Sequence, residues 1–299
     1  MRILICSDGT DTADKPARIG GLVGGSCHAE VTLLGIAEEP EAEQRLRAAL
    51  NSEAQLLGQY GLKPDIVLRS GEPIEQILQQ TSSLAYDLVV IGARTKETTG
   101  RYWRSPRAYE VIKAIPPPVV VASGQCERLS KFLVCTGGKQ YIDAAVQLTG
   151  EIAACTGAAV TLLHVMPEPP AIFADLVRRE EDVGALLAGS SELGSNLRQQ
   201  KEALEKLAVS ATVRVRHGIV DDEVFAEVAE GDHDLIVTGS SAARGALQHY
   251  IMGDLTRSIV NRADCPVLVA RPAKGVQIGG IWQALKRAFA VAPSGARAG

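Results

Sequence analysis

The stretch RSGEPIEQILQQTSSLAYDLVVIG (Arg69–Gly92) recurs, without a gap, as RHGIVDDEVFAEVAEGDHDLIVTG (Arg216–Gly239). Each copy begins with an arginine, continues through a segment of helical length, and ends in an apolar run with the pattern D-L-x-V-x-G. Self-similarity of this kind predicts that the chain is built from two copies of one structural unit.

Further matches extend both copies in the same order. ILICSDG (Ile3–Gly9) aligns with FLVCTGG (Phe132–Gly138), and VTLLGIAEEP (Val31–Pro40) aligns with VTLLHVMPEP (Val160–Pro169) at the same offset. Each copy closes on an apolar run that contains proline: PPVVVAS (Pro117–Ser123) and CPVLVAR (Cys265–Arg271).

The apolar runs predict the fold class. They are rich in Val, Ile and Leu and lack polar alternation, which fits strands buried on both faces. Segments of helical length, such as Glu41–Tyr60 and Pro73–Ala85, lie between them. This alternation predicts an α/β protein in which a small doubly wound unit with a parallel sheet occurs twice.

The repeat also predicts the domain boundaries. We expect domain 1 at residues 1–124 and domain 2 at residues 130–272, with an insertion at about 170–194 that contains helix and lies on the surface. A C-terminal tail, 273–299, has a short amphipathic segment at Ile281–Val291. This segment is interpreted as a helix docked on the body; a helix on a membrane surface or against a partner, and disorder, are the alternatives.

Composition narrows the class of protein. The chain has 299 residues, 46% of them hydrophobic, and a net charge of −4, which argues against disorder and against nucleic-acid binding. No signal peptide and no apolar stretch of 18 residues are visible, so a cytoplasmic protein is expected. None of the 6 cysteines forms C-x-x-C, which favours reduced, buried thiols.

The ordered blocks D-G-T, V-T-L-L, D-L-x-V-x-G and C-P-V-L-V resemble the universal stress protein family, over residues 1–124 and again over 130–272. The resemblance implies two tandem Rossmann-like domains, each an open five-stranded parallel sheet with helices on both faces. It also implies an intramolecular pseudo-dimer of the two domains, in which the last strands, Val119–Ala122 and Val267–Ala270, pair with each other.

Some members of this family bind ATP and carry G-x2-G-x9-G-[ST] after the fourth strand. The glycines let the backbone approach the phosphates, and the helix N-terminus attracts the anion. The resemblance therefore implies ATP or another adenine nucleotide, with Mg²⁺, as a cofactor. The candidate nucleotide-binding residues are Asp8, Gly9, Thr10, Ile36, Gly92, Arg94, Thr136, Gly137, Val165, Thr238, Gly239, Ala242, Gly253 and Asp254.

The second copy departs from the family motif. Gly239 matches the first glycine, Ala242 replaces the second, Gly253 falls one residue late, and Asp254 replaces the hydroxyl residue. A carboxylate about 4 Å from a phosphate charge is unfavourable by roughly 4 kcal/mol at an effective dielectric of about 20. The first-strand aspartate of the family is also missing, because Gly137 stands in its place.

The first copy departs from the family motif at different positions. Asp8, Gly9 and Thr10 match the first-strand turn, but the second glycine falls on Thr95, and Pro106 ends the motif without an N–H to offer a phosphate. The loop instead carries basic residues, which make either a solvated charged loop or an altered anion site: Arg94, Lys96, Arg101, Arg104 and Arg107.

The sequence contains no constellation typical of catalysis. G-x-S-x-G and G-K-[ST] are absent, and no two histidines have i, i+4 spacing. His164, at a strand end, is interpreted as a satisfied polar residue. We therefore expect a non-catalytic stress-response or regulatory protein, with a nucleotide-free scaffold or a nucleotide hydrolase of the related superfamily as alternatives. A homodimer and an unidentified protein partner stay open.

Asp254 provides a direct test. If its carboxylate repels phosphate, Asp254→Ser tightens ATP binding by up to about 4 kcal/mol. If it caps the following helix LTRSIVNRA, Asp254→Ala lowers stability by about 1 kcal/mol and leaves affinity unchanged. Calorimetric titration of ATP with Mg²⁺ distinguishes the two. Micromolar binding that the Asp254→Ser variant loses would contradict the repulsion and indicate a role in holding Mg²⁺.

Overall fold

The computed structural model describes residues 1–9, 14–92, 112, 114–115, 117–137, 143–167, 183–239 and 255–270. Within these residues, the strands of the first half are β1 (Arg2–Ser7), β2 (Glu30–Ala37), β3 (Asp65–Ser70), β4 (Leu88–Gly92) and β5 (Val119–Ala122). Those of the second half are β6 (Lys131–Cys135), β7 (Ala159–Met166), β8 (Ala211–His217), β9 (Leu235–Gly239) and β10 (Val267–Ala270).

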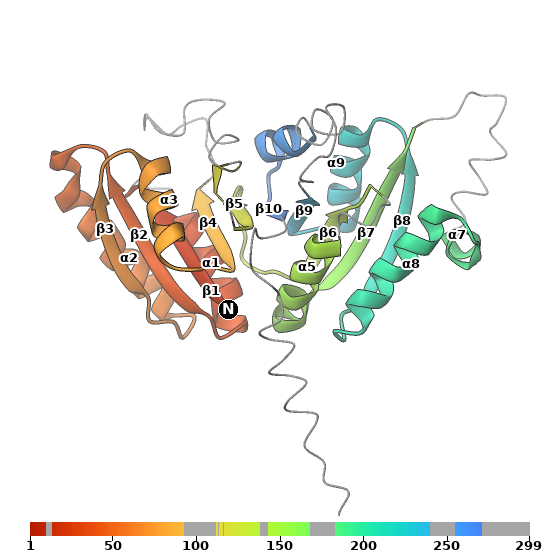
Figure 1. Cartoon of the computed structure of the whole chain (residues 1–299), viewed down its shortest axis with the longest axis horizontal. Helices are drawn as coiled ribbons and strands as arrows, with labels where there is room; N and C mark the ends of the chain where they lie inside the picture. The colour runs from red at the N-terminus through yellow and green to blue at the C-terminus, as the bar shows by residue number, and fades with distance from the viewer. Residues whose placement is uncertain are drawn as a thin grey trace, which may run out of the picture.

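Each half contributes five parallel strands in the same order, β3-β2-β1-β4-β5 and β8-β7-β6-β9-β10. This confirms the predicted fold class. The two sheets are not separate, because β5 and β10 pair antiparallel, with Val119 opposite Val269 and Val121 opposite Val267. The described strands thus form one 10-stranded sheet with the two last strands at its centre (Figure 1).

Helices cover both faces of the sheet. One face carries α1 (Asp14–Ser26), α2 (Glu43–Gly58), α5 (Asp143–Thr156) and α8 (Glu192–Glu205). The other carries α3 (Pro73–Ser83), α9 (Val220–Gly231) and a helix at 255–262. Alternate residues of β1 enter opposite cores, Ile3 and Ile5 one and Leu4 and Cys6 the other, which explains why the strands read as unbroken apolar runs.

The connection before the second helix differs between the halves. The first half has a 3-10 turn, η1 (Pro40–Ala42), before α2, whereas the second has α7 (Val183–Ala188) before α8. α7 packs on α8, where Arg198 donates a hydrogen bond to the Leu187 carbonyl. The helix expected in the insertion is therefore present at α7, while residues 168–182 lie outside the described part of the chain. None of the described helices is both long and apolar enough to span a membrane.

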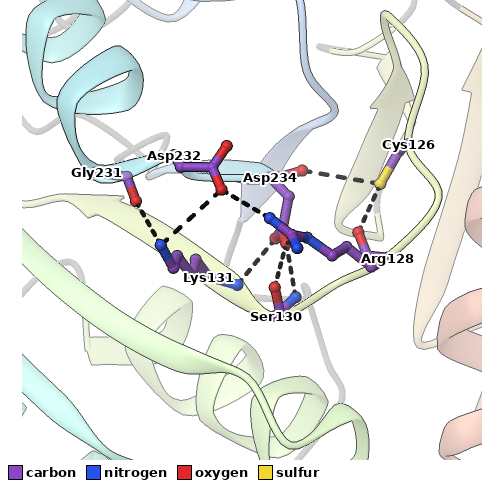
Figure 2. A network of polar contacts seen from close by, with 7 residues as sticks. All are labelled: Cys126, Arg128, Ser130, Lys131, Gly231, Asp232 and Asp234. Carbon is purple, nitrogen blue, oxygen red and sulfur yellow. Dashed lines mark hydrogen bonds and ion pairs between the residues drawn. The ribbon is translucent and has the colours of Figure 1, made fainter.

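The aspartate of D-L-x-V-x-G fixes the start of the first strand in each half. Asp87 accepts a hydrogen bond of 2.7 Å from the Arg2 amide. Its counterpart Asp234 accepts bonds from the amides of Ser130 (2.8 Å) and Lys131 (3.0 Å), as Figure 2 shows. The aspartate thereby satisfies backbone N–H groups that lie before the β1–β4 and β6–β9 ladders begin, which explains why the motif recurs with this residue.

The segment that joins the halves is held by the second half. Arg128 donates a hydrogen bond of 2.7 Å to Asp232, and Cys126 contacts the Arg128 carbonyl (Figure 2). Gly124 has a φ of +63°, and a Cβ there would lie 1.7 Å from the Asp264 carbonyl oxygen. Glycine is needed at this point because the segment passes so close to the backbone that leads into β10.

The arginine that opens the repeat has different partners in the two halves. Arg69 donates hydrogen bonds of 2.8 Å to the neutral amides of Gln79 and Gln80. Arg216 instead pairs with carboxylates, at 2.7 Å with Glu227 and 3.3 Å with Glu223. The Glu227 side chain is only 5% exposed, so its charge depends on this arginine.

We predict that Arg216→Ala lowers the free energy of unfolding by about 3 kcal/mol, because it leaves the buried Glu227 with the 3.5 Å contact to Arg214. Arg69→Ala is the matched control and should lower it by about 1 kcal/mol, since it removes bonds to neutral amides. Urea unfolding followed by circular dichroism measures both. Equal losses in the two variants would contradict the distinction.

Candidate nucleotide site

The strand order reverses once in each half. The chain passes from β1 to β2 and β3 on one side and then returns to β4 on the other side of β1; β6 and β9 have the same relation in the second half. In open α/β sheets, ligands bind in the crevice at the carboxyl ends of the strands at such a switch point.

The described candidate residues gather at these two switch points. Those of the first half are Asp8 and Gly9 directly after β1, Ile36 near the end of β2, and Gly92 at the end of β4. Those of the second are Thr136 and Gly137 after β6, Val165 in β7, and Thr238 and Gly239 at the end of β9. The candidates Thr10, Arg94, Ala242, Gly253 and Asp254 lie outside the described residues.

The turn after β1 requires glycine at one position. Gly9 has a φ of +68°, and its amide donates a hydrogen bond of 3.2 Å to the Ser7 hydroxyl. A left-handed residue here turns the backbone away from the strand direction immediately after the switch point. The D-G pair of the sequence motif thus serves the geometry of this turn.

A buried carboxyl group lies beneath the first switch point. Ser7 Oγ donates a hydrogen bond of 2.6 Å to Oε1 of Glu53, a residue of α2 that is 5% exposed. The other oxygen, Oε2, is buried without a hydrogen-bond partner. Burial raises the pKa of Glu53 to about 7; the bond from Ser7 opposes this rise, and the charges of Asp8 and Asp14 add to it.

The second switch point has a neutral group at the same place. Thr136 Oγ1 donates a hydrogen bond of 3.0 Å to Oε1 of Gln200, which is 2% exposed in α8. The Gln200 side chain also hydrogen-bonds Asp143, at the start of α5. Nδ1 of His164 donates to the Thr136 carbonyl at 2.9 Å, which confirms His164 as a satisfied polar residue, and burial lowers the pKa of His164.

Glu53 and Gln200 are equivalent positions of the repeat with different hydrogen-bonding capacity. An amide accepts through its oxygen and donates through its nitrogen, so Gln200 serves both Thr136 and Asp143. An ionised carboxylate only accepts, and Asp14 stands where Asp143 stands in the second half. Glu53 can therefore reproduce the arrangement of Gln200 only in its protonated form.

The sequence analysis did not identify Glu53 or Gln200 as site residues. A signal was present, because α2 buries Leu46, Leu50 and Leu57, and Glu53 interrupts that apolar stripe at helical spacing. In α8, Gln200 interrupts the corresponding stripe, between Leu197 and Leu204. A polar residue on a buried stripe indicates a partner inside the fold.

Comparison with protein families identifies the chain. The model of the universal stress protein family matches it twice, at residues 1–123 and 129–271. The chain belongs to the universal stress protein family. The comparison with curated proteins found no match.

Solved structures of universal stress proteins have the same fold. A universal stress protein from Archaeoglobus fulgidus superposes with a TM-score of 0.68 at 16% identity, covering 92% of this chain and 97% of that one. A putative universal stress protein from Pseudomonas aeruginosa gives a TM-score of 0.66 at 16% identity, covering 91% and 94%. These likenesses extend over both halves of the chain.

Metal ligands do not gather among the described residues. No group of three or more His, Cys, Asp or Glu side chains in this part of the chain could hold a metal ion.

Glu53 predicts a pH dependence of stability. Its pKa in the folded state is about 7, against an ordinary value of 4.5, so the folded state holds the proton over a pH range in which the unfolded chain has lost it. The stabilisation that Glu53 contributes is complete at pH values below its unfolded pKa. This contribution is lost as the pH rises through about 7, and the loss amounts to about 3 kcal/mol in total.

We therefore expect Glu53→Gln to raise the free energy of unfolding at pH 8 and to remove most of its decline between pH 5 and pH 8. Gln200→Glu is the reciprocal variant and should introduce a decline in the same range. Urea unfolding at a series of pH values measures both. An unchanged slope in Glu53→Gln would show that the Glu53 carboxyl group does not control it.

Proposed function

We propose that this universal stress protein is a non-catalytic regulatory protein whose second half binds an adenine nucleotide at the switch point between β6 and β9. The family resemblance makes adenine nucleotide the ligand class, and the described candidate residues of the second half lie around one edge of the sheet. The nucleotide would act as a signal that is bound and released, with Mg²⁺ accompanying its phosphates.

The charge difference between the two switch points carries this proposal. The first half presents Asp8 above the buried Glu53, whereas the second half has Gly137 and Gln200 at the equivalent positions. Two unit charges about 8 Å apart repel by about 2 kcal/mol at an effective dielectric of about 20. Among these four described positions, the second half therefore presents less negative charge to the phosphates of a nucleotide than the first half does.

The buried hydrogen bonds of the second half support the same assignment. Thr136, Gln200 and Asp143 satisfy one another, and Nδ1 of His164 donates to the carbonyl of Thr136, the residue directly after β6. A backbone carbonyl held in this way at the end of the strand needs little reorganisation to receive a ligand. Thr238, at the end of β9, is held in turn by Thr256, at 3.3 Å between the two hydroxyl oxygens.

We predict weak binding of ATP, with a dissociation constant of about 0.1–1 mM, in the presence of Mg²⁺ at pH 8.5. A carboxylate introduced by Gln200→Glu should weaken binding about tenfold or more, because a repulsion of about 2 kcal/mol exceeds the 1.4 kcal/mol that corresponds to a factor of ten. Glu53→Gln is the matched control and should leave the affinity unchanged. Isothermal titration calorimetry measures all three proteins.

Two outcomes would overturn the proposal. If the wild-type chain binds no ATP at 5 mM ligand, a nucleotide-free scaffold is the better description. If Glu53→Gln changes the affinity and Gln200→Glu does not, the nucleotide site lies in the first half. Thermal unfolding would reveal whether Gln200→Glu disturbs the packing of α8.

A further inference from the structure

A polar cavity lies between the start of α1 and the segment that follows β5. Its volume of about 340 Å³ is at the lower end of the range of roughly 300–1,000 Å³ that is usual for small-molecule sites. One wall contains Asp14 and Lys15 of α1, and the other is formed by residues 123–127. None of the described candidate residues for nucleotide binding lines this cavity, so it is a separate feature of the molecule.

The two walls belong to different halves. The helix α1 packs on strands of the first half, β1 and β4. Residues 123–127 are held by the second half, because Cys126 Sγ contacts the Asp234 carbonyl oxygen at 4.0 Å and the neighbouring Arg128 bonds Asp232 (Figure 2). A ligand in this cavity would therefore contact both halves.

The Ser123 side chain indicates that the cavity receives a polar ligand. Ser123 directly follows β5, lines the cavity and is only 7% exposed. Its backbone is fixed, since its amide donates a hydrogen bond of 3.0 Å to the Val121 carbonyl. Its hydroxyl group has no hydrogen-bond partner among the described residues. Buried hydroxyl groups are nearly always hydrogen-bonded, so this one is free to bond a ligand.

The charges of the cavity wall define the class of ligand. Four charged side chains line the cavity, two of each sign. Arg18 and Asp14 neutralise each other, with Nε and Oδ2 at 3.0 Å. Lys15 is half-buried, and neither it nor the exposed Glu127 forms an ion pair with another described residue. One ammonium group and one carboxylate therefore line the same cavity without a counter-charge.

Two uncharged side chains, Ile19 and Cys126, line the cavity as well. Burial raises the pKa of the Cys126 thiol to about 11, so this thiol is neutral and adds no charge to the wall. The sequence-based expectation of buried thiols is confirmed for Cys6 and Cys135 and is wrong for Cys155, which is exposed. The net charge of the described wall thus depends on its acidic and basic residues alone.

We propose that this cavity binds a free α-amino acid in its zwitterionic form. The carboxylate of the ligand accepts hydrogen bonds from the Lys15 ammonium group and the Ser123 hydroxyl group, and the ammonium group of the ligand donates to Glu127. A simple anion would meet the carboxylates of Asp14 and Glu127, whereas a zwitterion finds a partner for each of its charges. The volume equals that of about eleven water molecules at roughly 30 Å³ each, which is enough for an amino acid.

The experiment uses the full chain with L-glutamine as the probe, in calorimetric titration and in thermal unfolding. We expect binding in the millimolar range or tighter and a midpoint that rises with ligand concentration, because the ligand binds the folded state. N-acetyl-L-glutamine lacks the ammonium group and L-glutaminamide lacks the carboxylate, so each should bind about tenfold more weakly or worse. The other common L-amino acids at the same concentration extend the test to the whole class.

Variants of the cavity wall locate the site. Lys15→Gln and Glu127→Gln should each weaken L-glutamine binding about tenfold or more, and Ser123→Ala should weaken it several-fold. Lys63→Gln is the matched control, since Lys63 is exposed and lies outside the cavity, and it should bind as the wild type does. Gln200→Glu, which tests the nucleotide site, should also leave L-glutamine binding unchanged, so the two proposals can fail independently.

Three results would overturn the proposal. The first is a folded chain that binds none of the common L-amino acids at millimolar concentration. The second is L-glutaminamide that binds as tightly as L-glutamine, because the cavity would then recognise no carboxylate. The third is competition by inorganic phosphate for L-glutamine binding, which would indicate an anion site in place of a zwitterion site.

Discussion

The antiparallel contact between β5 and β10 determines how the two halves form one molecule. Both strands are four residues long and fully buried, Val119–Ala122 on one side and Val267–Ala270 on the other. Each would otherwise be the edge of a parallel sheet with unpaired backbone groups. Their pairing lets both hydrophobic cores run through the two halves and brings α1 against α5.

The two halves show how one scaffold tolerates different polar groups. Thr32 bonds the Tyr86 hydroxyl at 3.1 Å, and its counterpart Thr161 bonds His233 at the same distance. Such exchanges preserve each hydrogen bond and alter the fold little. The exchange of Gln200 for Glu53 is different, because it replaces a group that donates and accepts by one that does so only when protonated. This exchange is one of two differences in charge between the switch points, and the other is Asp8 against Gly137.

Much of the fold could be predicted from the sequence, because the patterns that indicate it lie within short stretches of the chain. Apolar runs without alternation predicted buried strands, and the repeat predicted that one unit occurs twice; both follow from periodicity along the chain. Glu53 and Ser7 are 46 residues apart, and only the packing of α2 on the sheet shows that they bond. The predicted phosphate loops lie outside the described residues, and Asp254 stays a prediction.

The segment between β5 and β6 has a further consequence for assembly. A contact between two four-residue strands is small, and two separate domains would have to meet by diffusion to form it. Here residues 123–130 join the partners, and short tethers of this kind produce effective concentrations in the millimolar range. The pairing of the halves is therefore independent of how much protein the cell contains, and it persists on dilution. Each half then evolves against one fixed neighbour. The two switch points are therefore free to diverge in charge.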